Sequence, residues 1–392
     1  MTLTRPKSSS IQIKEFCESH YDGNLQEGEF SEGAFRDILR KNDFGSRIRN
    51  AAVIGCLPDE IIENNDAVRP PPPSNKDAQL PPQQLVVVLE SGETVFLFAR
   101  PTSDGQFEFV TTSYPTPLRN VLVSPGFHLA VDPSSRYMAL GCAEDLFVVY
   151  ELETAEVMNQ RYVLGQPLQP VRSYQLRSVN GAIHKLDFLH PQKSDSSLVI
   201  LLLFMAKDGE SRMVTLDWQA GEALDKVLSL EKLGHRLPRL DQLPTLLIPL
   251  KMQSAFVMIS ENNIGVCTEA VHSSPVFISC QLQSPPATAN HHGIQKPLWT
   301  AWARPFRYST EDDCIYLVRE DGRIAFLEVD ADGGISNSII MSQKLDCHTA
   351  GAVSCLLGRS SEILVVGGSY SPGVVYRVSL DTSPHMQETD EY

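Results

Sequence analysis

The sequence lacks the features that would mark a membrane or secreted protein. Its longest apolar run, Leu198–Ala206, has nine residues, whereas a membrane-spanning helix needs roughly twenty. The N-terminal segment MTLTRPKSSS contains no apolar stretch typical of a signal peptide. The eight cysteines are scattered and are never spaced as CxxC, which indicates reduced, mostly buried thiols. These absences predict a soluble intracellular protein that does not interact with membranes.

Basic runs are also scarce. The chain has 33 Lys and Arg residues against 48 Asp and Glu residues, a formal net charge of −15. A surface this acidic repels phosphate backbones, so the composition argues against autonomous binding of nucleic acid.

The motifs of common enzyme classes are missing too. The chain contains no GxSxG, HExxH, Walker or GxGxxG pattern. Three polar pairs are weak candidates for metal binding or catalysis, and for each a structural role is favoured: His291-His292 in a loop, Cys347-His348 on a strand, and Asp312-Asp313 in a solvated turn. We therefore predict no catalytic residues, no metal site and no cofactor.

What the sequence does contain is a recurring pair of β-rich runs joined by a turn with Gly, Asn or Asp. The pair occurs at residues 85–98, 137–152, 198–218, 255–268, 314–329 and 362–380. Turn residues of these types tolerate positive φ, and β-branched and aromatic residues flank them. The spacing of roughly 50–65 residues is typical of the four-stranded blades of a β-propeller. Several first strands are apolar throughout, which indicates that both of their faces are covered.

Weaker segments complete each predicted blade. Inner strands are expected at residues 48–55, 127–131, 183–189, 246–250, 298–303 and 352–356, and outer strands at 107–112, 174–177, 275–281 and 338–345. One helix is expected, at Glu32–Lys41. Asp132-Pro133-Ser134-Ser135-Arg136 has the chemistry of a type I turn with a structural role.

The remaining segments define the domain boundaries. Residues 1–10 are expected to be a disordered N-terminus, residues 11–380 a single propeller, and residues 381–392 a disordered acidic tail. Within the propeller we expect a Pro-rich insertion at residues 69–82 and a loop at residues 283–296.

Trp299, Trp302 and Arg304 are the candidate partner-binding residues. The two tryptophans lie three positions apart on one predicted strand and are expected to face opposite sides. An exposed tryptophan beside an arginine would suit a protein interface, although core packing is the favoured role for each ring.

Several segments, in order, resemble one family. Residues 129–152, 183–191, 211–218, 312–329 and 361–380 resemble blade motifs of the first propeller of the family that comprises the large DNA-damage-binding subunit, the A subunit of the cleavage and polyadenylation specificity factor, and the propeller subunit of splicing factor 3b. WTAWARP at Trp299–Pro305 is similar to fungal members with a methyl-methanesulfonate-sensitivity N-terminal domain.

The resemblance implies an all-β, seven-bladed, WD40-like propeller. Ile11–Phe16 resembles a family strand that several others normally precede, and only ten residues precede it here. The first blade and the ring closure are therefore expected to be incomplete, as in a truncated member.

By the same resemblance, the protein is expected to be a non-catalytic scaffold in a nuclear complex for mRNA 3′-end processing, splicing or DNA-damage-linked ubiquitin ligation. Its partners would be protein subunits, with nucleic acid reached only through the complex. Three alternatives stay open: a nucleic-acid-binding propeller, a WD-repeat protein, and a hydrolase or lyase with a metal in the channel. The last would need inward carboxylates or histidines, for which His184 and Asp187 are the candidates on the inner strands.

Overall fold

The structure is a computed structural model of the chain. It describes residues 11–18, 33–55, 80–102, 106–115, 117, 128–141, 145–192, 195–228, 235–236, 244–251, 254–260, 263–268, 276–281, 298–304, 313–320, 323–330, 334–340, 350–357, 362–368, 374–378 and 386–391. The chain divides into two compact units, residues 1–14 with 37–241 and residues 15–36 with 242–392.

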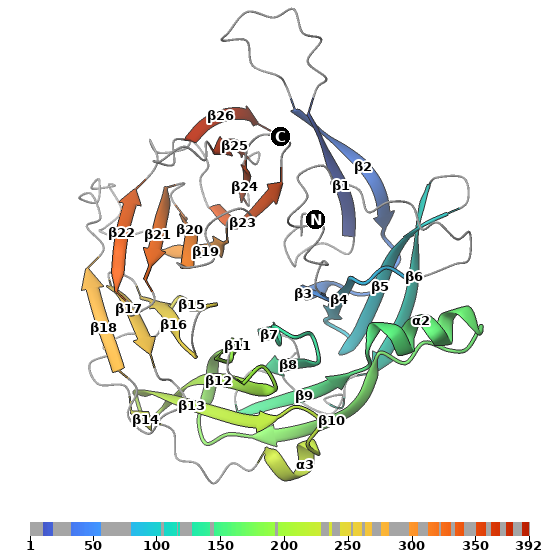
Figure 1. Ribbon diagram of the computed structural model, residues 1–392, viewed down its shortest axis with the longest axis horizontal. Coiled ribbons are helices and arrows are strands. Elements are labelled where there is room, and N and C mark those ends of the chain that lie inside the picture. The colour runs from blue at the N-terminus through green and yellow to red at the C-terminus, as the bar shows by residue number, and fades with distance from the viewer. Residues whose placement is uncertain are drawn as a thin grey trace, which may run out of the picture. The chain divides into compact units, whose positions relative to one another are not determined.

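The first unit contains three four-stranded antiparallel sheets, and each consists of strands consecutive in sequence (Figure 1). The first sheet contains β3 (Ile48–Ile54), β4 (Gln84–Leu89), β5 (Glu93–Pro101) and β6 (Phe107–Pro115). The second contains β7 (His128–Val131), β8 (Tyr137–Gly141), β9 (Leu146–Leu152) and β10 (Val171–Ser178). The third contains β11 (Ala182–Leu189), β12 (Leu198–Lys207), β13 (Glu210–Gln219) and β14 (His235–Arg236).

The second unit repeats the same arrangement in its own three sheets. The first of them contains β15 (Leu246–Pro249), β16 (Phe256–Ile259), β17 (Asn263–Thr268) and β18 (Val276–Gln281). The next contains β19 (Trp299–Ala303), β20 (Asp313–Arg319), β21 (Ile324–Val329) and β22 (Ile335–Ile340). The last contains β23 (Ala350–Leu357), β24 (Glu362–Gly368), β25 (Val374–Val378) and β26 (Met386–Glu391).

All six hairpins expected from the sequence are present as central strand pairs of these sheets. The β12–β13 hairpin shows why the turn residues matter. Asp208 and Gly209 have φ values of 53° and 78°, the left-handed conformation that a two-residue hairpin turn requires and that Asp and Gly adopt most readily. The turn chemistry thus sets the register of ten consecutive residue pairs between the two strands.

The core lies between neighbouring sheets of the same unit. One apolar cluster joins the β3–β6 sheet to the β7–β10 sheet, and a second joins the β7–β10 sheet to the β11–β14 sheet. In the second unit a cluster joins the β15–β18 and β19–β22 sheets. Every residue of β4 is buried, as are Val199–Met205 of β12, because both faces of these strands are covered. Continuous apolar runs therefore marked sandwiched strands, as predicted.

The expected helix at Glu32–Lys41 is wrong. Residues 33–41 form β2 (Gly33–Lys41), which is hydrogen-bonded to β1 (Ile11–Glu18) in a two-stranded sheet. Short apolar segments fit a strand or a helix equally well on periodicity alone, and pairing with the preceding strand β1 decided the outcome.

Two helices are found where none was expected. Helix α2 (Ala155–Val163) begins after Thr154, whose hydroxyl accepts a hydrogen bond from Val157 N at 3.4 Å, and α3 (Leu224–Val227) is a single turn. In the sequence, Thr154 as the N-cap residue with Glu156 in the first turn is a typical signal for the start of a helix. Strands β14 and β26 were also missed, and β26 lies in the tail that was expected to be disordered. The outer strand expected at 338–345 instead spans 335–340 among the described residues.

Candidate interaction surface

Trp299 and Trp302 both belong to the packed interior of the second unit. A register shift between Trp299 and Ala301 places an extra residue in β19 opposite β20. Such a bulge reverses the alternation of side chains, so both indoles pack on the same apolar cluster. The prediction that they face opposite sides is therefore wrong. Trp299 is 2% exposed, and Trp302 is partly buried, so core packing is the main role of both rings.

Arg304 is a structural clamp rather than an exposed interface residue. Its Nε lies 3.0 Å from Asp313 Oδ1, its Nη2 donates to the Pro249 carbonyl, and its guanidinium stacks 5.1 Å from the centre of the Trp302 ring. Asp313 also accepts a hydrogen bond from Lys251 N. The Asp313 side chain is 2% exposed and that of Arg304 17%. This cluster ties the β15–β18 sheet to the β19–β22 sheet, and Asp313 is not in the solvated turn that was expected.

The Asp132–Arg136 turn has an equivalent role in the first unit. Asp132 is buried, its carboxylate accepts from the Ser134 hydroxyl, and its main-chain carbonyl accepts from Ser135 N at 2.7 Å. Ser135 Oγ in turn accepts from Gly55 N at 2.9 Å, and Arg136 Nη2 donates to Ser196 O at 3.3 Å. The turn thereby fastens its own sheet to both neighbouring sheets. Burial raises the pKa of the Asp132 carboxyl, and its hydrogen bonds oppose that shift in part.

Polar side chains meet where the first strands of two sheets pack together. His128 on β7 lies near Lys185 and His184 on β11, and Lys185 lies near Asp187. Burial, reinforced by the positive charge of Lys185, lowers the pKa of His128 to about 4. Burial also lowers the pKa of Lys185. His128 is therefore a neutral packing group at physiological pH.

No group of three or more His, Cys, Asp or Glu side chains converges as a metal site anywhere in the described part of the chain. Residues His291, His292, Cys347, His348 and Asp312 lie outside the described residues, as do the loop at 283–296 and residues 69–79 of the Pro-rich insertion. Within the same described ranges, no helix is long and apolar enough to cross a membrane.

The exposed apolar surface that sequence reasoning missed lies in the first unit. Among the described residues, the large apolar side chains that are exposed are Phe107 (42%), Val163 (58%), Leu164 (61%) and Tyr174 (46%). Two of these are consecutive and form the end of helix α2, which we call the α2 tip (Val163 and Leu164). A helix in this position was not expected, so the pattern of strands gave no signal for the tip.

Helix α2 packs against the β3–β6 sheet. Asn159 Oδ1 accepts from Leu80 N at 2.9 Å, the Arg100 guanidinium lies 5.3 Å from the centre of the Tyr162 ring, and Met158 is buried. The chain after the helix is fixed too, because Thr112 Oγ1 donates to Leu168 O at 3.2 Å. The helix end is closed by Gly165, whose φ is 65° and whose N–H donates to Tyr162 O. The α2 tip is thus an apolar projection on a fixed support.

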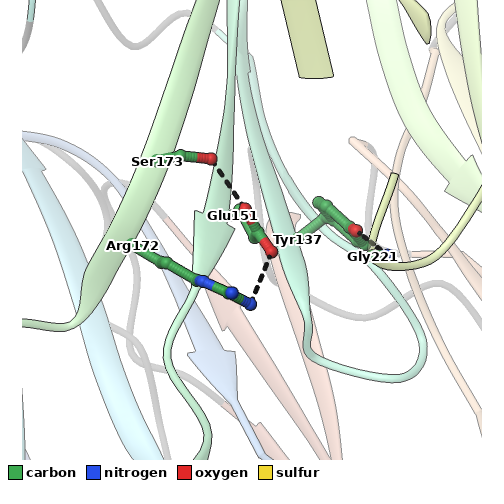
Figure 2. Close-up of polar contacts among 5 residues, drawn as sticks. All are labelled: Tyr137, Glu151, Arg172, Ser173 and Gly221. Atoms are coloured by element: carbon green, nitrogen blue, oxygen red, sulfur yellow. Dashed lines mark hydrogen bonds and ion pairs between the residues drawn. The ribbon is translucent and has the colours of Figure 1, made fainter. Parts of the chain in front are cut away.

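Strand β10, at the outer edge of its sheet, is joined to β9 by side-chain hydrogen bonds as well as by the backbone (Figure 2). The Glu151 carboxylate accepts from Arg172 Nη1 at 3.1 Å and from Ser173 Oγ at 2.7 Å, across a register shift between Val171 and Ser173. Arg177, further along, donates to the Leu228 and Asp225 carbonyls next to helix α3. Figure 2 also shows the Tyr137 hydroxyl, which accepts from Gly221 N at 3.0 Å and so joins the second and third sheets.

A shallow cleft of about 450 Å³ lies beside the start of β6. It is lined by Leu39, Arg40, Lys41, Asn42, Asp43, Phe107, Glu108 and Phe109. Two ion pairs lie here, Lys41 with Asp43 at 2.7 Å and Arg100 with Glu108 at 2.5 Å, while Arg40 Nε donates to Asn42 Oδ1 at 2.8 Å. The cleft therefore combines apolar rings with little net charge.

Successive four-stranded antiparallel sheets, packed on one another through apolar faces, are the blades of a β-propeller. The chain matches the family described as the RSE1/DDB1/CPSF1 first beta-propeller over residues 8–390. It belongs to that family, which confirms the resemblance found in the sequence. No curated protein matches the chain.

Proposed function

We propose that the protein is a non-catalytic scaffold that presents a rigid propeller surface to protein subunits of a nuclear complex. Its membership in the RSE1/DDB1/CPSF1 first-propeller family supports a scaffold role. The proposed complex acts in mRNA 3′-end processing, in splicing or in DNA-damage-linked ubiquitin ligation. The domain is proposed to have seven blades, of which the two-stranded β1–β2 sheet is the incomplete one. It is proposed to begin near residue 11 and to extend past the boundary expected at residue 380, because β26 pairs with β25 in the last sheet.

The observation that carries the proposal is the α2 tip. Val163 and Leu164 are more than half exposed on a helix whose other side is fixed by hydrogen bonds and ring stacking. Apolar side chains at a rigid, preorganised position gain affinity on burial without a large ordering cost. Tyr174 on β10 is 46% exposed, and its ring contacts Tyr150 on β9 and Tyr114 on β6. Tyrosines are enriched at interfaces.

Nucleic acid is proposed to be reached only through partner subunits, because the net charge of −15 opposes direct binding to phosphate backbones. A gel shift at low salt tests this part. Binding of RNA or DNA by the chain alone at micromolar concentrations would contradict it.

The scaffold proposal is tested by affinity purification from nuclear extract with subunit identification by mass spectrometry. The wild type should recover a defined set of nuclear proteins. The double variant Val163→Asp/Leu164→Asp should lose at least one of them, because charged side chains oppose burial of the tip. Gln166→Asp is the matched control: it adds a carboxylate at an exposed position two residues beyond the tip and should leave recovery unchanged.

Recovery of no nuclear partner by the wild type would contradict the scaffold role. Undiminished recovery by the double variant would instead remove the α2 tip from the interface and leave the wider role standing.

A further inference from the structure

At the outer edge of strand β6, backbone groups point outward in a regular pattern, and no other described strand pairs with them. β6 ends the order β3-β4-β5-β6, so one of its edges has no neighbouring strand in the sheet (Figure 1). In the loop before it, Thr102 N donates to Gln106 O at 2.7 Å. That bond continues the β5–β6 register, in which Pro101 faces Phe107 and Arg100 faces Glu108. The even-numbered residues of β6 therefore form backbone hydrogen bonds with β5, and the odd-numbered residues of β6 point their N–H and C=O groups away from β5.

Among the outer strands of the described four-stranded sheets, β6 has the longest uninterrupted pairing. β6 pairs with β5 over nine consecutive residues with no register shift. By contrast, β14 has two residues, β18 pairs regularly over six, and the pairings of β10, β22 and β26 are interrupted by register shifts. β6 (FEFVTTSYP) also contains no lysine, and its only proline is its last residue. Long, regular edges without lysine or an internal proline are the ones that pair most readily with another chain.

The sequence of β6 is self-complementary in one antiparallel register. With Thr111 placed opposite Thr111 of a second copy, Phe109 faces Ser113 and Phe107 faces Pro115. In this register, odd-numbered residues of one copy face odd-numbered residues of the other. The outward N–H groups of Phe107, Phe109, Thr111 and Ser113 therefore each face an outward carbonyl of the second copy.

Charge and exposure fit the same register. Glu108, the only charged residue of β6, falls opposite Tyr114 and not opposite its own copy, so no like charges meet across the pair. Phe107, which is 42% exposed at the rim of the cleft, is covered by Pro115 of the other copy. Thr111 and Ser113 are exposed, so no other described part of the chain covers them.

We propose that two copies of this chain associate through antiparallel pairing of their β6 edges, with Thr111 on the twofold axis. This inference goes beyond the proposed scaffold function and does not depend on it. An isologous contact of this kind closes on itself and yields a dimer, not a fibre.

Sedimentation or light scattering across roughly 1–300 μM tests the association, because interfaces of this small size are weak. The mass of the wild type should rise from 43.5 kDa toward twice that value. Thr111→Pro should keep the protein monomeric, because it removes an outward N–H while the bonds to β5 come from the neighbouring residues. Thr111→Lys should do the same by opposing two ammonium groups on the axis. The matched control Gln169→Lys adds the same charge at an exposed residue outside β6 and should still dimerise.

Cysteine cross-linking tests the register. Across the axis the two Cα atoms at position 111 would lie about 5.5 Å apart, within disulfide range. Those at position 113 would be separated by about 13 Å along the strand. Under mild oxidation Thr111→Cys should therefore give a 111–111 link in peptide mapping, whereas Ser113→Cys should give no 113–113 link.

A wild type that stays monomeric at every concentration overturns the proposal. A dimer that persists in both Thr111→Pro and Thr111→Lys places the contact elsewhere and overturns it as well. Cross-linking at 113 without cross-linking at 111 refutes the register. Circular dichroism verifies that each variant is folded, and Thr111→Lys retains the backbone groups should the proline disturb the strand.

Discussion

Replacing Arg304 with alanine is expected to destabilise the second unit more than any change at an exposed ion pair. Arg304 compensates the carboxylate of Asp313, whose side chain is 2% exposed, at a distance of 3.0 Å. It also donates to the Pro249 carbonyl and stacks on Trp302. Removing the guanidinium leaves a buried charge that retains the hydrogen bond from the Lys251 backbone N–H but loses its ion pair.

Loss of one partner of a buried ion pair costs about 3–5 kcal/mol. We expect a loss of unfolding free energy at the lower end of this range, about 3 kcal/mol. The Arg304 side chain is 17% exposed, so water can partly enter the space that the substitution leaves. Arg304→Lys should fall between the wild type and Arg304→Ala, because an ammonium keeps the charge but not the planar fork of donors.

Urea unfolding followed by tryptophan fluorescence measures this effect, since Trp302 stacks on Arg304 and Trp299 packs in the same apolar cluster as Trp302. Arg172→Ala is the matched control. Arg172 pairs with Glu151 at 3.1 Å, but its side chain is 65% exposed, so its loss should cost less than about 1 kcal/mol. Equal shifts of the urea midpoint for the two alanine variants, or a smaller shift for Arg304→Ala, would refute the argument from burial.

Three further predictions concern single groups of the first unit. His128, held neutral with a pKa of about 4 against 6.5 when unfolded, contributes stability that is fully present above pH 6.5 and is lost as pH falls toward 4. The loss is at most about 3 kcal/mol, and His128→Gln should flatten that part of the stability profile; an unchanged profile would argue against the shift. Tyr137→Phe should lower stability by about 1 kcal/mol, because it removes the acceptor of the Gly221 N–H; an unchanged melting temperature would contradict this. Gly55→Ala should cost more than Gly45→Ala: both have positive φ, but an added Cβ would clash with the Pro82 carbonyl oxygen at Gly55 and meets nothing within 4 Å at Gly45. Equal melting temperatures for the two alanine variants would argue against that clash.

The sequence by itself determined the repeating fold of this protein. Apolar runs such as Leu198–Ala206, followed by Asp208-Gly209 and a second β-rich run, encode a hairpin through local turn chemistry and strand propensity. Because that information is local and recurs along the chain, the six hairpins and the family could both be predicted from the residues alone.

Only the tertiary structure decided the features that depend on contacts outside the six predicted hairpins. Residues 33–41 are a strand because β1 pairs with them, and Trp302 turns toward the core because of a bulge that the sequence does not mark. The carboxylate of Asp313 is buried because Arg304 and Lys251, from two different sheets, converge on it. The exposed α2 tip and the open edge of β6 likewise depend on which surfaces the other elements leave uncovered. Burial is a property of the assembled sheets, so the residues available to a partner could not be chosen from the sequence alone.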